Sequence, residues 1–281
     1  MRLTVEHRTR YQFDAPMALL VQSLRLWPTE FEGQDVFSWS VEVEGHEADR
    51  GAALRDGAGD WIETLSMRGV TDVAVVVRGE VETRDLSGVA RGLREKVPPE
   101  AYLRPTRMTY LTPGLRELAE GATDGVEGQL DRAHAMARAV REAIVYTPGI
   151  TESSTTAGEA FEAGRGVCQD QTHALIAVAR ALGMPGRYVV GYLHASADGS
   201  SHQASHAWAE LFVDGLGWVG FDAANGCCPD EKYVRLGSGL DSIAAAPIRG
   251  VARGRGTEEM SVEVRVLDAA QSRQRQSQQQ S

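Results

Sequence analysis

The sequence has little of several features that would place it in a familiar class of protein. It contains three cysteines, Cys168, Cys227 and Cys228, which are too few for the disulfide framework of a small secreted domain. No apolar run approaches the roughly 20 residues that a membrane span needs. The charged N-terminal segment is not followed by the apolar stretch of a secretory signal. We therefore expect a protein of the reducing cytoplasm that does not enter a membrane.

Basic charge is also scarce. The 281 residues include 29 Lys and Arg against 39 Asp and Glu, a formal net charge of −10. Nucleic acids and anionic membranes attract basic surfaces, so this balance argues against either as the main partner. Cys227 and Cys228 could be read as metal ligands together with His206, but no CxxC spacing supports a zinc site. We expect neither a metal nor another cofactor.

What the first part of the chain does contain is a regular alternation of apolar and polar side chains. The alternation runs through residues 3–13, 37–43 and 73–81, as in strands with one buried face. It predicts an all-β, sandwich-like N-terminal lobe over residues 1–88. Residues 89–113 contain four prolines, which predicts a linker that leads to a second lobe.

Helical spacing appears in the second half of the chain. Residues 130–144 repeat apolar side chains at helical intervals. Thr156, with Glu159 three residues later, is a capping-box signal for a short helix. A further helix is expected from Cys168 onward, with Gly183 in the position where a left-handed residue ends a helix.

Strands return after this helix. They are expected at residues 187–193, 204–213, 217–222 and 260–267. The helices and strands together make residues 114–268 a second folded unit. Residues 269–281 are rich in Gln and Ser and poor in apolar side chains, which predicts a disordered tail.

Three segments of the second unit carry a thiol, an imidazole and a carboxylate. Cys168 stands at a predicted helix start, His206 lies on one predicted strand, and Asp222 lies at the end of the next. A helix N-terminus and a neighbouring imidazole lower a cysteine pKa from about 8.5 to roughly 3.5–7.5. A carboxylate fixes the tautomer and orientation of the imidazole. The pattern predicts an acyl-transfer enzyme with Cys168, His206 and Asp222 as catalytic residues.

The spacing of His206 and Asp222 can be checked against the geometry of a hairpin. Side chains alternate across a strand, so the two residues share a face only in certain registers. A three-residue loop at 213–215 would place them directly opposite each other, and a loop at 214–216 would make them diagonal neighbours. Three-residue hairpin loops that contain glycine are common. The spacing is therefore compatible with a hydrogen bond between His206 and Asp222.

These motifs resemble the transglutaminase-like superfamily, and specifically its bacterial members. The matching stretches of the second unit are 166–170, 180–193, 204–210 and 217–222. The resemblance implies a Cys-His-Asp triad, which falls on Cys168, His206 and Asp222. It also implies an α+β fold with a papain-like core, in which the helix that carries Cys168 lies against a small antiparallel sheet.

The N-terminal part resembles the β-rich region that accompanies this core in bacteria. The matching stretches are His7-Arg8-Thr9-Arg10-Tyr11 and Leu24-Arg25-Leu26-Trp27-Pro28. The sequence departs from the family after Asp222, where Pro-Thr-Asn-Gly is usual and Ala223-Ala224-Asn225-Gly226 stands instead.

Other residues are candidates for supporting roles. Trp208 and Trp218 are expected to wall the substrate cleft, with burial in the core as the alternative. The backbone N–H of Cys168 is expected to stabilise the oxyanion, and Tyr146 or another upstream residue could add a side-chain donor. Asp170 is expected to stabilise the first turn of its helix.

Three functions remain open from the sequence. Hydrolysis of amide bonds in a peptide or protein substrate is favoured, because residues 194–204 are small and polar and aromatic content is only 6%. Acyl transfer from glutamine, as in transglutaminase cross-linking, uses the same thioester and is the alternative. A non-catalytic binding module is the third.

Overall fold

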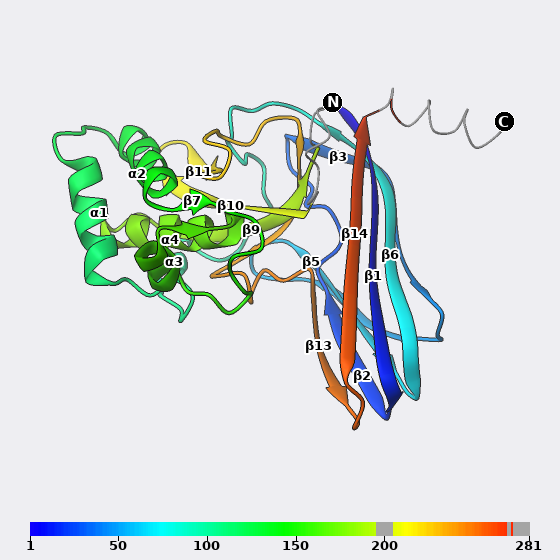
Figure 1. The fold of residues 1–281 in the computed structure, drawn as a ribbon. Helices are drawn as coiled ribbons and strands as arrows, with labels where there is room; N and C mark the ends of the chain where they lie inside the picture. Colours follow the sequence, from blue (N-terminus) through cyan, green and yellow to red (C-terminus); the bar gives the residue numbers. More distant parts are fainter. Residues whose placement is uncertain (195–204, 269–270, 272–281) are drawn as a thin grey trace.

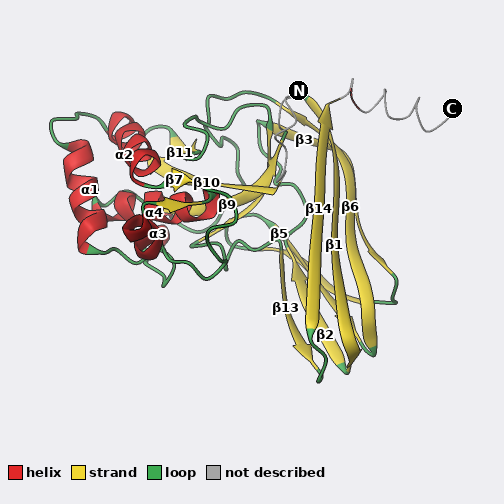
Figure 2. Ribbon diagram, in the orientation of Figure 1, coloured by secondary structure: helices red, strands yellow, loops and turns green. Residues whose placement is uncertain are grey.

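The computed structural model describes residues 1–194, 205–268 and 271, and these residues form two lobes (Figure 1). Within this part of the chain, the α-helices gather in one lobe, and long strands build the other (Figure 2). The predicted α+β class with a β-rich N-terminal lobe is confirmed. The polar loop at 195–204 and the predicted tail, apart from Gln271, lie outside the described residues.

The β lobe is a sandwich of two antiparallel sheets. One sheet has the order β14 (Glu258–Asp268), β1 (Arg2–Met17), β6 (Val70–Thr83) and β3 (Gln34–Glu44). The other has the order β13 (Ile248–Arg253), β2 (Leu19–Leu24), β5 (Trp61–Met67) and β4 (Asp49–Arg55). Every second side chain of β1 from Leu3 to Phe13 is buried, which explains why the alternation of the sequence identifies this strand.

The last two strands differ from the predicted organisation. The prediction grouped residues 248–268 with the second unit, but β14 pairs along its length with β1, and β13 pairs with β2. The first and the last of the described strands therefore both lie in the β lobe. Alternation of side chains identifies a strand but says nothing of its partner, and here the partners lie more than 200 residues away in the sequence.

The helical lobe contains a four-stranded antiparallel sheet. Its order is β11 (Gly217–Phe221), β10 (Ser205–Val213), β9 (Gly186–Leu193) and β12 (Tyr233–Gly239). Helix α4 (Cys168–Ala181) packs against β9 and β10 and is buried along most of its length. The helices packed around it are α1 (Pro113–Thr123), α2 (Gln129–Ala143) and α3 (Ala157–Ala163). Every residue from Ala174 to Ala179 is apolar and buried, so this part of α4 is apolar on all sides, which explains its central place.

Short segments complete the helical lobe. The two-residue strands β7 (Val145–Tyr146) and β8 (Arg165–Gly166) pair in parallel just before α4. The segment at 89–113 includes a 3-10 helix, η1 (Pro99–Leu103), and packs on this lobe rather than hanging free, because the buried Tyr102 ring contacts Trp218. None of the described helices is long and apolar enough to cross a membrane.

Candidate active site

Cys168 is the first residue of α4, as the sequence predicts. The helix starts there because the Asp170 carboxylate accepts the Val167 backbone N–H at 2.8 Å and the Thr151 hydroxyl at 2.7 Å. The interpretation of Asp170 as a stabiliser of the first turn is thus confirmed. The Asp170 side chain is fully buried, and burial raises its pKa. The two hydrogen bonds lower the pKa, but by less than burial raises it. The cap holds the Cys168 sulfur at the positive end of the helix.

His206 and Asp222 meet across the hairpin of β10 and β11. Val213 pairs with Gly217, so the loop occupies 214–216 and the two residues are diagonal neighbours, the second of the predicted registers. The His206 Nε2 atom lies 2.6 Å from the Asp222 Oδ2 atom. Both side chains are buried.

Asp222 is held by groups that the sequence analysis did not single out. Its Oδ2 atom also accepts the Tyr233 hydroxyl at 2.7 Å and the Asn225 side-chain amide at 2.6 Å. The Asn225 backbone N–H donates to Oδ1 at 3.1 Å. Burial raises the Asp222 pKa, but the hydrogen bonds and the charge of His206 outweigh it, so the pKa lies below its usual range. The Asn225-Gly226 pair that follows Asp222 is the sequence signal from which this role of Asn225 could have been predicted.

The Cys168 thiol also forms a hydrogen bond with the His206 ring, and the Asn225 side-chain amide lies 3.4 Å from Nε2. Since Nε2 faces Asp222, the Nδ1 atom is the one left for the sulfur. Burial lowers the His206 pKa, but the hydrogen bonds and charges of Asp222 and Cys168 outweigh burial and raise the pKa to about 10. His206 is therefore protonated at neutral pH. A cation beside a thiol favours the thiolate. The three predicted catalytic residues therefore form one hydrogen-bonded series.

A cleft of about 910 Å³ opens beside Cys168 and His206. The start of α4 and strands β9 and β10 supply one wall, through Tyr188, Val190 and Ala207. The loop after β12, the start of β13 and one face of β14 supply the other, through Ile243, Ala246, Pro247, Arg249, Met260, Val262 and Val264.

Neither Trp208 nor Trp218 is among the described residues that line this cleft, and both are buried. Trp208 is buried and packs its ring against those of His206 and Tyr233, with ring centres 6.5 and 5.4 Å apart, respectively. The Trp208 ring is stacked against the His206 imidazole. Trp218 pairs with Phe212, about 20 Å of strand away from His206, and packs beneath the Arg187 guanidinium at 3.9 Å.

Tyr146 lies near the nucleophile without lining the cleft. It pairs with Gly166, two residues before Cys168, and its side chain is 44% exposed. Burial of the hydroxyl raises the Tyr146 pKa first, and the nearby charges of Cys168 and Asp222 raise it further. The phenol therefore stays protonated and can donate a hydrogen bond.

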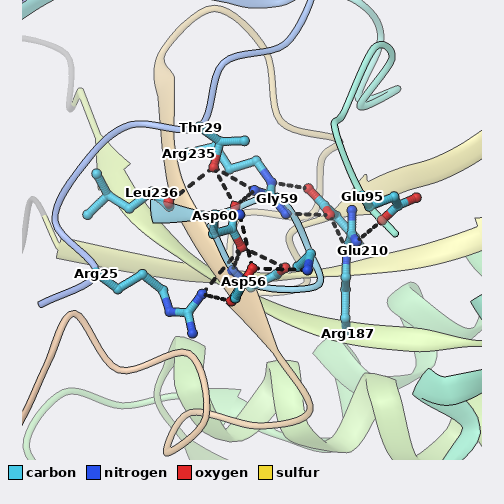
Figure 3. Close-up of polar contacts among 12 residues, drawn as sticks. Arg25, Thr29, Asp56, Gly59, Asp60, Glu95, Arg187, Glu210, Arg235 and Leu236 are labelled. Carbon is cyan, nitrogen blue, oxygen red and sulfur yellow. Dashed lines mark hydrogen bonds and ion pairs between the residues drawn. The ribbon is translucent and has the colours of Figure 1, made fainter. Parts of the chain in front are cut away.

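A buried ionic network that the sequence did not predict joins strands β9, β10 and β12 of the helical lobe to the β lobe (Figure 3). Glu210, four residues after His206 on β10, accepts from Arg187 Nε at 2.7 Å and from Arg235 Nε at 2.9 Å. Arg235 also donates to Asp60 of the β lobe at 2.9 Å and to Thr29 at 2.7 Å. Glu210 is fully buried, which raises its pKa, but the two guanidinium groups lower it to about 2. Both lobes therefore contribute charged side chains to this network, Arg235 from the helical lobe and Asp60 from the β lobe.

No set of His, Cys, Asp and Glu side chains that could hold a metal ion gathers anywhere in the described part of the chain.

Comparisons with known proteins agree on one family. The model of the Transglutaminase-like superfamily matches residues 116–223, and the model of the Bacterial transglutaminase-like N-terminal region matches residues 3–82. An uncharacterised protein of Mycobacterium leprae is 30% identical over 96% of this chain and 99% of its own length. An uncharacterised Mycobacterium tuberculosis protein is 25% identical over 89% of this chain and 87% of its own.

A solved structure from Cytophaga hutchinsonii, described as a candidate cysteine protease, has a similar fold. It matches with a TM-score of 0.73 and 23% identity, over 96% of this chain and 91% of that one. Its similarity therefore extends over both lobes.

Proposed function

The chain belongs to the transglutaminase-like superfamily, and from that premise we propose that it is a thiol enzyme acting on amide bonds of peptides or proteins. The observation that carries the proposal is the hydrogen-bonded series of Cys168, His206 and Asp222 at the edge of a cleft. The triad supplies a nucleophile, a proton donor and a group that orients the donor.

In the first step, the Cys168 thiolate attacks the carbonyl carbon of the amide, and the carbonyl electrons move to oxygen. The Cys168 backbone N–H and the Tyr146 hydroxyl are the proposed donors to that oxyanion. His206 then gives its Nδ1 proton to the departing nitrogen as the carbon–nitrogen bond breaks. An amine leaves, and a thioester remains on Cys168.

In the second step, His206 takes a proton from water as the water oxygen attacks the thioester carbonyl. The carbon–sulfur bond breaks, and the products are a carboxylic acid and the regenerated thiolate. An amine in place of water would give a new amide, which is the transglutaminase outcome.

Hydrolysis is favoured by the lining of the cleft. An efficient transferase must exclude water and position an amine, which calls for a closed cleft lined by aromatic side chains. Tyr188 is the one aromatic side chain among the described lining residues, and Ser153, Ser154 and Gln169 add polar groups at the same cleft. Trp208 and Trp218 pack elsewhere.

Acyl transfer is the second candidate, and one observation favours it. The half-exposed Tyr146 ring stands near Cys168 outside the cleft, where it could pack against an incoming amine. A binding module without catalysis is disfavoured, because burying a His-Asp pair is costly and gives a binding surface nothing.

The test is to incubate the protein with a glutamine-containing peptide and a primary amine at millimolar concentration, and to weigh the products. We expect deamidated or cleaved peptide to outnumber amine adducts, and the Cys168→Ala variant to give neither. Amine adducts in excess would replace hydrolysis by transfer. Equal product from the wild type and Cys168→Ala would contradict the proposed nucleophile.

A further inference from the structure

The cleft beside Cys168 has a wall from each lobe, and the wall from the β lobe has no part in the proposed bond-breaking steps. It consists of one face of β14 and the start of β13. Figure 1 shows both strands on the side of the sandwich that faces the helical lobe. A wall that stands next to the nucleophile and takes no part in the chemistry is suited to selecting the substrate.

The β14 part of this wall is apolar and uncovered. Met260 and Val262 pair with Tyr11 and Thr9 of β1, so all four side chains lie on the same face of the sheet. Tyr11 and Thr9 are buried, but Met260 and Val262 are 54% and 49% exposed. Large apolar side chains left open in the wall of a cleft favour a ligand with an apolar surface.

The shape of the wall favours an extended ligand. Residues 260–264 span about 14 Å of strand, the length of about four extended residues of a peptide. In the described part of the chain, β14 is an edge strand that pairs on one side with β1. A straight apolar wall along a strand edge is a surface on which extended peptides bind.

Arg249 adds a charge to this apolar wall. Apart from the catalytic pair Cys168 and His206, it is the one charged side chain among the described residues that line the cleft. It is exposed, and no ion pair or side-chain hydrogen bond joins it to another described residue. Most arginines of the β lobe, such as Arg25 and Arg50, do have an acidic partner. An unpaired guanidinium at the edge of an apolar cleft is suited to binding a carboxylate.

We propose that this enzyme selects peptides that carry a carboxylate close to the reacting amide, with Arg249 binding the carboxylate and β14 packing against an apolar residue of the same segment. The inference rests on the proposed function and names its substrate class. The carboxylate can come from an acidic side chain or from a free C-terminus, because a guanidinium binds both in the same way.

The experiment uses synthetic peptides with one scaffold around a Leu-Gln pair. Glu, Gln or Lys stands in turn at each of three positions on either side, and each peptide is made with a free and with an amidated C-terminus. Relative kcat/KM values are measured by competition and mass spectrometry. We expect the wild type to prefer Glu over Gln about ten- to hundredfold at one position, or the free C-terminus over the amide by a similar factor.

Arg249→Gln should abolish this preference, so that the ratio of kcat/KM between the Glu and Gln peptides falls to about one. Arg249→Glu should reverse the preference towards Lys. The matched control is Arg253→Gln, which removes an exposed arginine from the same face of β13 outside the cleft and should keep the preference. A preference that is absent in the wild type, or that survives in Arg249→Gln, overturns the inference.

The apolar part of the wall has its own pair of variants. Val262→Thr keeps the shape of the side chain but makes it polar, and it should raise KM several-fold with kcat unchanged. Val251→Thr is the control, because Val251 is an exposed valine of β13, at 65% against 49% for Val262, that is not among the described residues lining the cleft. Equal effects of the two substitutions would contradict the assigned role of β14.

A probe that needs no turnover separates this inference from the proposed function. Peptides that end in an acrylamide and carry Glu or Gln are allowed to alkylate Cys168, and the rates are compared in the wild type and Arg249→Gln. Faster labelling by the Glu probe that depends on Arg249 supports the inference. Labelling of Cys168 with no such difference overturns the inference alone, and a protein that neither labels at Cys168 nor turns over peptide overturns both.

Discussion

Cys227 and Cys228 lie in the turn that follows Asp222, close to the candidate active site, yet their sulfur atoms are in different surroundings from that of Cys168. Burial raises the Cys227 pKa, although a hydrogen bond with Tyr233 opposes it, and burial raises the Cys228 pKa to about 11. Neither thiol has a histidine or a helix N-terminus beside it. We expect Cys168 to be alkylated by iodoacetamide at neutral pH well before the other two.

Peptide mapping after limited alkylation measures this order. Cys227 is the informative comparison, because its side chain is exposed and iodoacetamide can reach it. Faster modification of Cys227 or Cys228 than of Cys168 would show that the environment at the start of α4 does not activate the sulfur.

Asp222 controls the proton affinity of His206. Its hydrogen bond is the largest of the causes that raise the His206 pKa, and its charge raises it further, so the Asp222→Asn variant should lower that pKa. The alkaline limb of the kcat/KM profile, where the imidazolium loses its proton, should therefore move to lower pH. An amide also favours the wrong imidazole tautomer, and the equivalent change in serine proteases costs about 10⁴-fold in turnover. We expect kcat to fall by about 10²- to 10⁴-fold.

Tyr233→Phe is the matched control for this prediction. It removes one hydrogen bond from Asp222 but keeps the carboxylate charge, so the alkaline limb should stay close to that of the wild type. A profile of Asp222→Asn that coincides with the wild type would show that Asp222 does not set the protonation of His206.

At the residue scale, the triad could be predicted because each member has a reactive side chain and stands on a recognisable local element. The supports of Asp222 could not be predicted as easily, since Tyr233 reaches the carboxylate only through the pairing of β12 with β9. The tryptophans were misleading for a similar reason. A strand pattern shows that Trp218 is buried, but not whether it is buried beside a cleft.

Helix α4 depends on the cap that Asp170 provides. Asp170→Ala leaves the Val167 N–H and the Thr151 hydroxyl without their acceptor, and we expect it to reduce the free energy of unfolding by about 1–2 kcal/mol. The same change should slow alkylation of Cys168, because the first turn loses its fixed geometry. Asp170→Asn is the matched control, since its carbonyl oxygen can accept the same hydrogen bonds without burying a charge.

Urea unfolding and the rate of Cys168 alkylation measure both effects. Asp170→Asn should stay close to the wild type in both, because burial already disfavours the charge of the carboxylate. Wild-type stability in Asp170→Ala would show that the helix start is held by tertiary packing instead.

At the element scale, local signals served the prediction well. The capping box at Thr156 and Glu159 is present, and the β10–β11 hairpin has one of the two expected three-residue loops. Helices and hairpins are specified by residues near one another in the sequence. The pairing of β13 and β14 with the first strands is not, and neither is the cleft wall that follows from it.

The whole molecule is held together by charges that both lobes contribute. The net charge of −10 could not predict this network, because a net charge does not show which side chains are buried in pairs. A buried ionic network contributes less to stability than its contacts suggest, but removing one partner leaves the others uncompensated. The cytoplasmic location expected from the sequence stays a prediction.

We expect substitution of Glu210 to destabilise this network most, because Glu210 is the one described acidic residue that pairs with both Arg187 and Arg235. Glu210→Gln should therefore reduce the free energy of unfolding by about 3–5 kcal/mol. Glu42→Gln, which breaks an exposed pair with Arg78, should cost less than about 1 kcal/mol.

The dependence on pH separates the lost charge from a general loss of packing at Glu210. The folded state lowers the Glu210 pKa from its ordinary value of 4.5 to about 2, so its contribution to stability is complete above the unfolded pKa and fades as pH falls towards 2. Glu210→Gln has no such proton to bind, so its deficit relative to the wild type should shrink over that window. Urea unfolding between pH 7 and pH 2.5 measures the deficit. A deficit that stays constant across this range would mean that the variant disturbs packing, and that the charge of Glu210 does not join the lobes.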